Sequence, residues 1–175
     1  MRWVVLLRGI NVGGANRLPM AELRGSVESI GATEVATYIQ SGNLVLTDDR
    51  SEGELIDALH DTILERHGLD LAVVVRSADE MVRIAAQHPE ADRHIDHKFV
   101  YVTFLDRAPT EQAIAELDPD AHLPDRWTID GRELFVVYPL GSGRSKLTIE
   151  RFERAWGVTA TARNMNTVRK LAGMV

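Results

Sequence analysis

The sequence contains no cysteine, so disulfide bonds, thiolate catalysis and cysteine-ligated zinc or iron–sulfur centres are excluded. The fold therefore has to be stabilised by packing, and 45% hydrophobic residues in a chain of 175 suffice for a sizeable core. Long hydrophobic runs are also missing. The apolar stretch 3–7 lacks the length and cleavage site of a secretory signal, and no run is long enough to span a bilayer. We therefore expect a cytoplasmic protein with no membrane partner.

Motifs for catalysis or cofactor binding are missing too. The glycines of 141–146 lack the order and spacing of a Walker loop, and those of 9–14 lack the spacing of a dinucleotide-binding loop. The segment 93–97 holds two histidines and an aspartate, but we favour an exposed loop there over a metal site. The other histidines show no serine-histidine-aspartate arrangement. We therefore identify no catalytic residue, no metal site and no cofactor, and whether the protein is an enzyme stays open.

Charge of both signs is present but unevenly distributed. The net charge is −6, yet residues 1–25 carry +3, residues 141–175 carry +5 and the segment 26–140 carries −14. Arginine supplies 17 of the 20 basic residues. This choice favours bidentate recognition of phosphate or carboxylate, although a high-GC genome produces the same bias. The basic ends of the chain also hold its most glycine-rich and asparagine-rich loops.

Hydrophobic spacing in the first part of the chain predicts alternating strands and helices. We expect strands at 2–7, 34–40, 43–47 and 71–75, with helices at about 19–30 and 51–67. Ser51 with Glu54 indicates a capping box, and Gly68 is typical of a helix end. Ser41 and Gly42 suit a tight hairpin. This order, strand-helix-strand-strand-helix-strand, is that of a ferredoxin-like unit.

The same order recurs in the second part. A linking helix begins with a capping box at Ser77 and Glu80, and a loop at 89–97 follows. We then expect strands at 99–104, 125–129, 133–138 and 158–161, helices beginning at Thr110 and Ser145, and a final helix at 163–173. Asp130 and Gly131 indicate the hairpin of this unit.

These elements predict an α+β fold made of two ferredoxin-like (β-α-β-β-α-β) units with antiparallel sheets. Residues 1–76 are expected to form the first unit, and 77–97 the linking helix and loop. Residues 98–175 are expected to form the second unit with its C-terminal helix, which turns Met165, Val168 and Leu171 to one side.

Four polar loops at strand ends suit an anionic ligand, because glycine-rich backbone amides backed by arginine bind anions. In an antiparallel β-α-β-β-α-β unit, the loop after the first strand and the central hairpin lie at one end of the sheet. The loop before the second helix and the segment after the last strand share the other end. If the two units pack head to tail, these loops face one another and form one basic pocket for a phosphate-bearing small molecule at the loop junction, with Ser145 at a helix N-terminus. The candidate ligand-binding residues are Arg8, Asn11, Asn16, Ser41, Asn43, Arg144, Ser145, Lys146, Arg163 and Asn164.

The four loops also carry a family resemblance. They contain the stretches 6–14 (LLRGINVGG), 38–43 (YIQSGN), 143–146 (GRSK) and 161–167 (TARNMNT). In these motifs the chain resembles the bacterial "domain of unknown function 1697" family over essentially its whole length. The resemblance implies an α+β fold of two ferredoxin-like units and no activity. One departure is Met165, where we expect tryptophan, and this weakens the case for a stacking role of that side chain.

Other functions stay open beside anion binding. A purely structural role is one alternative: the glycines and asparagines of these loops would then only form turns, and the arginines would form ion pairs with the acidic middle of the chain. Ferredoxin-like sheets bind RNA in other proteins and both termini are basic, but 6% aromatic residues and an acidic net charge disfavour nucleic acid. A structural or protein-interaction role is neither supported nor excluded, and the oligomeric state is undetermined.

Overall fold

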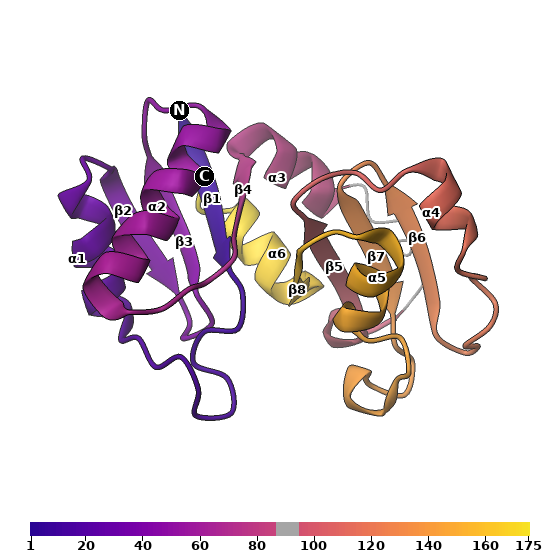
Figure 1. Ribbon diagram of the computed structural model, residues 1–175. Helices are drawn as coiled ribbons and strands as arrows, with labels where there is room; N and C mark the ends of the chain where they lie inside the picture. The colour runs from indigo at the N-terminus through magenta and orange to yellow at the C-terminus, as the bar shows by residue number, and fades with distance from the viewer. Residues whose placement is uncertain (87–94) are drawn as a thin grey trace. The chain divides into compact units, whose positions relative to one another are not determined.

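A four-stranded antiparallel sheet with two helices packed on one face is formed twice along the chain (Figure 1). The computed structural model describes residues 1–86 and 95–175. Two compact units result: the first comprises Met1–Met81 together with Leu171–Val175, and the second comprises Val82–Lys170. The predicted α+β class, with two antiparallel sheets in ferredoxin-like order, is confirmed.

Unit 1 contains the elements β1 (Arg2–Leu7), α1 (Met20–Ser29), β2 (Thr33–Tyr38), β3 (Asn43–Thr47), α2 (Glu52–His67) and β4 (Val73–Ser77). Its strands lie in the order β2-β3-β1-β4. The central strand β1 is buried on both faces, in agreement with its uninterrupted apolar sequence. Trp3, Val5 and Leu7 point to the face that packs against α1 and α2.

The ends of α2 follow the sequence signals. Ser51 and Glu54 form the reciprocal capping box, and Gly68 adopts the left-handed conformation with φ +65°. The hairpin between β2 and β3 is longer than predicted, because four residues, 39–42, join the strands and Ile39 and Gly42 both have positive φ. The strand β4 begins two residues later than predicted and extends to Ser77.

Unit 2 contains β5 (Val100–Leu105), α4 (Glu111–Ala115), β6 (Arg126–Asp130), β7 (Glu133–Val137), α5 (Ile149–Trp156) and β8 (Ala160–Asn164). The strand order β6-β7-β5-β8 is equivalent to that of unit 1. Its helix-side core is aromatic: Trp127 makes edge contacts with Phe152 and Trp156, with ring centroids 5.7 and 5.5 Å away. Such edge contacts stabilise a core beyond the area they bury.

Two predictions for unit 2 were wrong. The helix α5 does not begin at Ser145: its N-cap is Thr148, whose hydroxyl accepts a hydrogen bond from the Arg151 amide. Both residues are good N-caps by type, and a short 3₁₀ turn, Ser142–Arg144, occupies the chain before Ser145 instead. The last strand is also displaced, from 158–161 to Ala160–Asn164.

Two further helices complete the described chain. The linking helix α3 (Ala78–Ala86) begins with the predicted capping box of Ser77 and Glu80. Most of the loop predicted at 89–97 lies outside the described residues, and its end forms a 3₁₀ turn at His97–Phe99. The C-terminal helix α6 (Met165–Ala172) buries the predicted face of Met165, Val168 and Leu171.

Candidate functional site

In unit 1 the loop after β1 contacts the β2–β3 hairpin through Asn11. The side-chain amide of Asn11 donates to the carbonyl oxygens of Gln40 (2.8 Å) and Leu18 (2.9 Å), and its oxygen accepts from the Leu18 amide at 2.9 Å. The sheet therefore brings this loop and the hairpin to the same end, as antiparallel topology requires. All the main hydrogen-bonding directions of the Asn11 side chain are used within the unit.

The other predicted asparagines of unit 1 have similar partners. Asn16 donates to the carbonyl oxygen of Gly9 at 3.0 Å, and Asn43, which is fully buried, donates to Tyr38 O and Ser41 Oγ. Asn11 and Asn16 have φ of +55° and +47°, a conformation that asparagine tolerates better than most residues. These side chains hold the shape of the loops.

A hollow of about 450 Å³ lies at this end of unit 1. It is lined by Asn11, Gly14, Arg17, Leu18, Pro19 and Gln40. Arg17 is the one cation in that lining, and sequence analysis did not select it. Arg8, which was selected, is half-buried and outside the lining, and it has interactions of its own.

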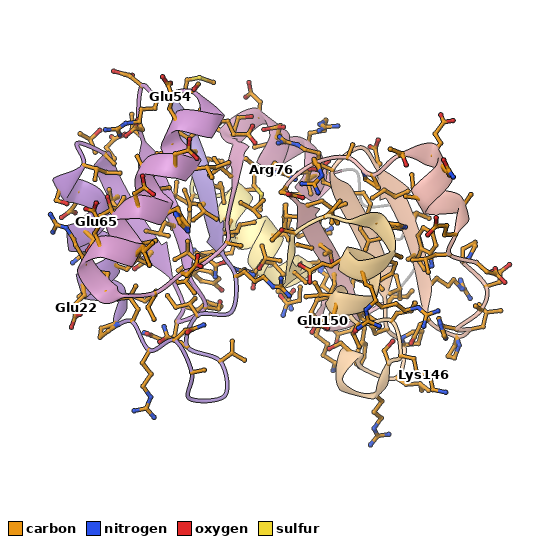
Figure 2. The ribbon with its side chains drawn as sticks, viewed as in Figure 1. Glu22, Glu54, Glu65, Arg76, Lys146 and Glu150 are labelled. Carbon is orange, nitrogen blue, oxygen red and sulfur yellow. The ribbon has the colours of Figure 1, made fainter. Side chains whose placement is uncertain are left out.

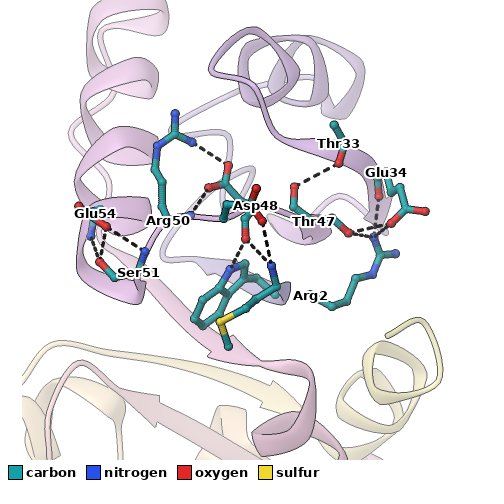
Figure 3. A network of polar contacts seen from close by, with 11 residues as sticks. Arg2, Thr33, Glu34, Thr47, Asp48, Arg50, Ser51 and Glu54 are labelled. Carbon is teal, nitrogen blue, oxygen red and sulfur yellow. Dashed lines mark hydrogen bonds and ion pairs between the residues drawn. The ribbon is translucent and has the colours of Figure 1, made fainter.

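A polar network occupies the opposite end of unit 1 (Figure 3). Arg50 donates to the buried Asp48 carboxylate at 2.7 Å and to the carbonyl oxygen of Ile30 at 2.6 Å, while the Trp3 indole donates to Asp48 O at 3.2 Å. A hollow of about 420 Å³ adjoins it and includes Gly31 and Asp49. Through Arg50 the network connects the end of β3 to the end of α1. Because Arg50, the arginine that lines this hollow, is already paired with Asp48, it offers little to an anion.

Unit 2 has a hollow of about 310 Å³ between the segment before β6 and the loop after β7. These segments are neighbours because β6 and β7 pair antiparallel, with Arg126 opposite Val137 at the end of the hairpin strands. We call this space the hairpin-end hollow. Its lining residues are Ala121, His122, Leu123, Pro124, Asp125, Leu140, Gly141, Arg144, Ser145 and Lys146.

Arg144, Ser145 and Lys146 were predicted from the sequence, and the structure brings all three to the hairpin-end hollow. Arg144 and Lys146 are exposed, and within the described residues neither side chain has a hydrogen bond or an ion pair (Figure 2 labels Lys146). Ser145 accepts a hydrogen bond from the Leu147 amide at 2.9 Å, which fixes the backbone between the two cations.

Tyr138 anchors the loop that carries these cations. Its hydroxyl donates to the carbonyl oxygen of Leu147 at 2.8 Å. Burial raises the pKa of the Tyr138 phenol well above its ordinary value, and the nearby Asp125 carboxylate raises it further. The phenol therefore stays protonated at physiological pH and keeps this hydrogen bond.

Two further residues that line the hairpin-end hollow, the carboxylate of Asp125 and the imidazole of His122, were not among the binding residues predicted from the sequence. Asp125 is 8% exposed, and its carboxylate has no hydrogen bond or ion pair among the described residues. His122 Nε2 is buried, also without a partner in the described chain. The Asp130-Gly131 hairpin signal implies that the segment before β6 lies beside the loop after β7, so topology is the signal that could have identified both residues.

Arg163 and Asn164 do not line the hairpin-end hollow. The register puts Asn164 at the same sheet end, opposite Tyr101, but β5 lies between β7 and β8. Arg163 is 8% exposed and donates to Thr161 Oγ1 and Ala162 O, and burial lowers the pKa of its guanidinium to about 10. Asn164 accepts from the Thr167 amide at 3.0 Å at the start of α6.

Other site types find no support in the described residues. No cluster of three or more histidine, aspartate or glutamate side chains suits a metal ion there, and Arg93 and His94 of the segment considered from the sequence lie outside them. None of the described helices is both long and apolar enough to cross a membrane. Met165 is 1% exposed, so its side chain belongs to a core and not to a stacking surface.

Comparison with a family model shows the family, and comparison with solved structures shows the fold. No curated protein matches the chain. A solved structure, that of the conserved bacterial protein SP0830 from Streptococcus pneumoniae, is similar with a TM-score of 0.69 and 24% sequence identity, covering 99% of this chain and 97% of that one. The model of the family described as "Protein of unknown function (DUF1697)" matches residues 1–135. The chain therefore belongs to the DUF1697 family.

Proposed function

We propose that this protein binds a phosphate-bearing, anionic small ligand in the hairpin-end hollow of unit 2. The observation that carries the proposal is that Arg144 and Lys146, two cations without a partner in the described chain, line one hollow of about 310 Å³. Cations near acidic side chains usually form ion pairs, and these two remain available although acidic residues outnumber basic ones 26 to 20.

The two cations have complementary roles toward a phosphate group. The planar guanidinium of Arg144 binds two oxygens at once, whereas the Lys146 ammonium acts as a compact point charge. Ser145 adds a hydroxyl between them. The buried hydrogen bond from Tyr138 to Leu147 holds the loop in place, so less conformational entropy is lost when a ligand binds.

The loops of unit 1 support this proposal less strongly. Asn11, Asn16 and Asn43 already use their side-chain amides within the unit, and the hollow there has a single cation, Arg17, in its described lining. We therefore assign the ligand contact to Arg144, Ser145 and Lys146. The remaining candidates other than Arg8 have a structural role in the hydrogen bonds described above.

The proposal predicts that phosphate compounds stabilise the protein through these cations. Inorganic phosphate, a sugar phosphate and AMP are to be titrated in a thermal unfolding assay; a ligand at 100 times its Kd raises Tm by roughly 5–10 °C for a chain of this size. Arg144→Ala combined with Lys146→Ala should reduce affinity by at least about tenfold, which corresponds to about 1.4 kcal/mol.

Arg154→Ala is the matched control, because Arg154 is an exposed arginine near the end of α5 and outside the lining of the hollow. It should respond to ligand as the wild type does. A flat Tm with every phosphate compound would refute the proposal, as would an unchanged response in the double variant.

A further inference from the structure

The hairpin-end hollow contains a carboxylate as well as its two cations. Asp125 lines the same space as Arg144 and Lys146, and it is the one acidic residue in the described lining. It is 8% exposed, and neither a hydrogen bond nor an ion pair involving its carboxylate occurs within the described residues. Aspartate is rarely buried to this extent unless it is paired.

The surroundings of Asp125 explain why it has no partner inside the protein. The Tyr138 hydroxyl lies near Asp125, and the charge of Asp125 contributes to the raised pKa of that phenol. This hydroxyl does not bind Asp125, because it donates its hydrogen to Leu147 O. The Asp125 amide donates to the carbonyl oxygen of His122, which fixes the backbone turn at the hollow that Asp125 lines. A ligand with a hydrogen-bond donor that enters the hollow would therefore supply the partner that Asp125 lacks within the described residues.

The charges in the lining indicate the chemistry of that ligand. Arg144 and Lys146 contribute two positive charges and Asp125 one negative charge, so the lining has an excess of one positive charge. A phosphate monoester alone carries about −1.5 to −2 at neutral pH, and an ammonium group on the same molecule brings the total close to −1. A phosphate compound with an amine thus matches both the sum of the charges and their separation.

We propose that the occupant of the hairpin-end hollow is a zwitterionic amine phosphate, whose phosphate contacts Arg144 and Lys146 and whose ammonium group donates to the Asp125 carboxylate. This inference rests on the proposed function and narrows its ligand class. A charge-assisted hydrogen bond to a buried carboxylate is stronger than a neutral one, so the amine distinguishes such ligands from phosphates that lack it.

A matched pair of small probes tests the inference. O-phosphoethanolamine carries both groups, and ethyl phosphate is the same two-carbon phosphate monoester without the amine. We expect wild-type protein to bind O-phosphoethanolamine at least about tenfold more tightly in isothermal titration calorimetry. Asp125→Asn should bring the ratio of the two affinities close to one, whereas Arg144→Ala should weaken both probes by a similar factor and preserve the ratio.

The outcomes separate this inference from the proposed function. If ethyl phosphate and O-phosphoethanolamine bind equally well to the wild type, phosphate binding stands and the amine assignment is overturned. If neither probe binds, both proposals fail together. A preference that survives in Asp125→Asn overturns the role of Asp125. Should that variant fail to fold by circular dichroism, N-acetylated O-phosphoethanolamine gives the answer with wild-type protein: weaker binding supports the ammonium contact, and equal binding overturns it.

Discussion

At the scale of single residues, Gly42 is subject to two independent restrictions. Its φ is +71°, and a Cβ atom placed there would lie 2.4 Å from Ile10 Cγ2 and 2.8 Å from Leu7 Cβ. Left-handed backbone disfavours alanine, and overpacking of a buried site adds a further penalty. We expect Gly42→Ala to lower the free energy of unfolding by roughly 2–4 kcal/mol, measured by urea denaturation.

Gly68→Ala separates the two effects. Gly68 has a similar φ of +65°, but an added Cβ would have no neighbour within 4 Å. That variant should lose only about 1 kcal/mol, the cost of the left-handed conformation. Equal losses in the two variants would show that the close approach of Gly42 to Ile10 and Leu7 has no energetic consequence.

Residue types in the sequence indicated where polar loops lie, but not how each side chain is used. Asn11 and Arg163 both looked suited to a ligand, yet Asn11 joins its loop to the hairpin and Arg163 is buried within its sheet. Asp125 was overlooked because an aspartate before a strand is common at turns. Its significance comes from burial without a partner, which depends on packing between segments distant in sequence.

At the scale of elements, an imidazole joins α2 to the segment before β4. His60 Nε2 lies 3.0 Å from Asp70 Oδ1, and Nδ1 lies 3.3 Å from Asp61 Oδ1. The hydrogen bond with Asp70, followed by that with Asp61, raises the pKa of His60 above 6.5. A pKa raised in the folded state means that protonated His60 stabilises the fold, so this stability is complete below about pH 6.5 and is lost as pH rises through the folded pKa.

We therefore expect His60→Gln to remove part of the pH dependence of stability. The wild type should lose less than about 1 kcal/mol from this pair between pH 5.5 and 8.5, because the side chains are partly exposed and screened by solvent. Urea denaturation at both pH values measures the difference, and Asp70→Asn should reproduce the effect of His60→Gln. An identical pH dependence in all three proteins contradicts the assignment.

Element boundaries were predictable where a specific local interaction sets them. The capping boxes at Ser51 and Ser77 and the left-handed Gly157 were recognisable, because each involves residues within a few positions. The start of α5 was mistaken since Ser145 and Thr148 are both acceptable caps, and sequence alone does not show that a 3₁₀ turn comes first. The displaced limits of β4 and β8 depend on pairing with β1 and β5, respectively, which are remote in sequence.

At the scale of the whole molecule, the order of elements was enough to predict two ferredoxin-like sheets. Each sheet repeats the same strand order, and within each unit consecutive strands are joined by a helix or by a hairpin. Within each sheet the central strand is apolar on both faces, as Val4 and Leu6 in β1 and Val102 and Phe104 in β5 are buried beside the helix-side residues. The sequence did not show that the chain returns to unit 1 at its last described residues, Leu171–Val175, which are part of that compact unit.

This return predicts that one helix affects the two units separately. Leu171 in α6 is fully buried and belongs to unit 1, whereas Val168, one turn earlier and also fully buried, belongs to unit 2. Leu171→Ala should cost about 2–5 kcal/mol and reduce amide protection in β1 and β3, while β5 and β7 keep theirs. Val168→Ala is the matched control and should reduce protection in β5 and β7 first. Hydrogen exchange read by mass spectrometry resolves these strands, and loss of protection from the same strands in both variants would mean that α6 and both sheets unfold as a single cooperative body.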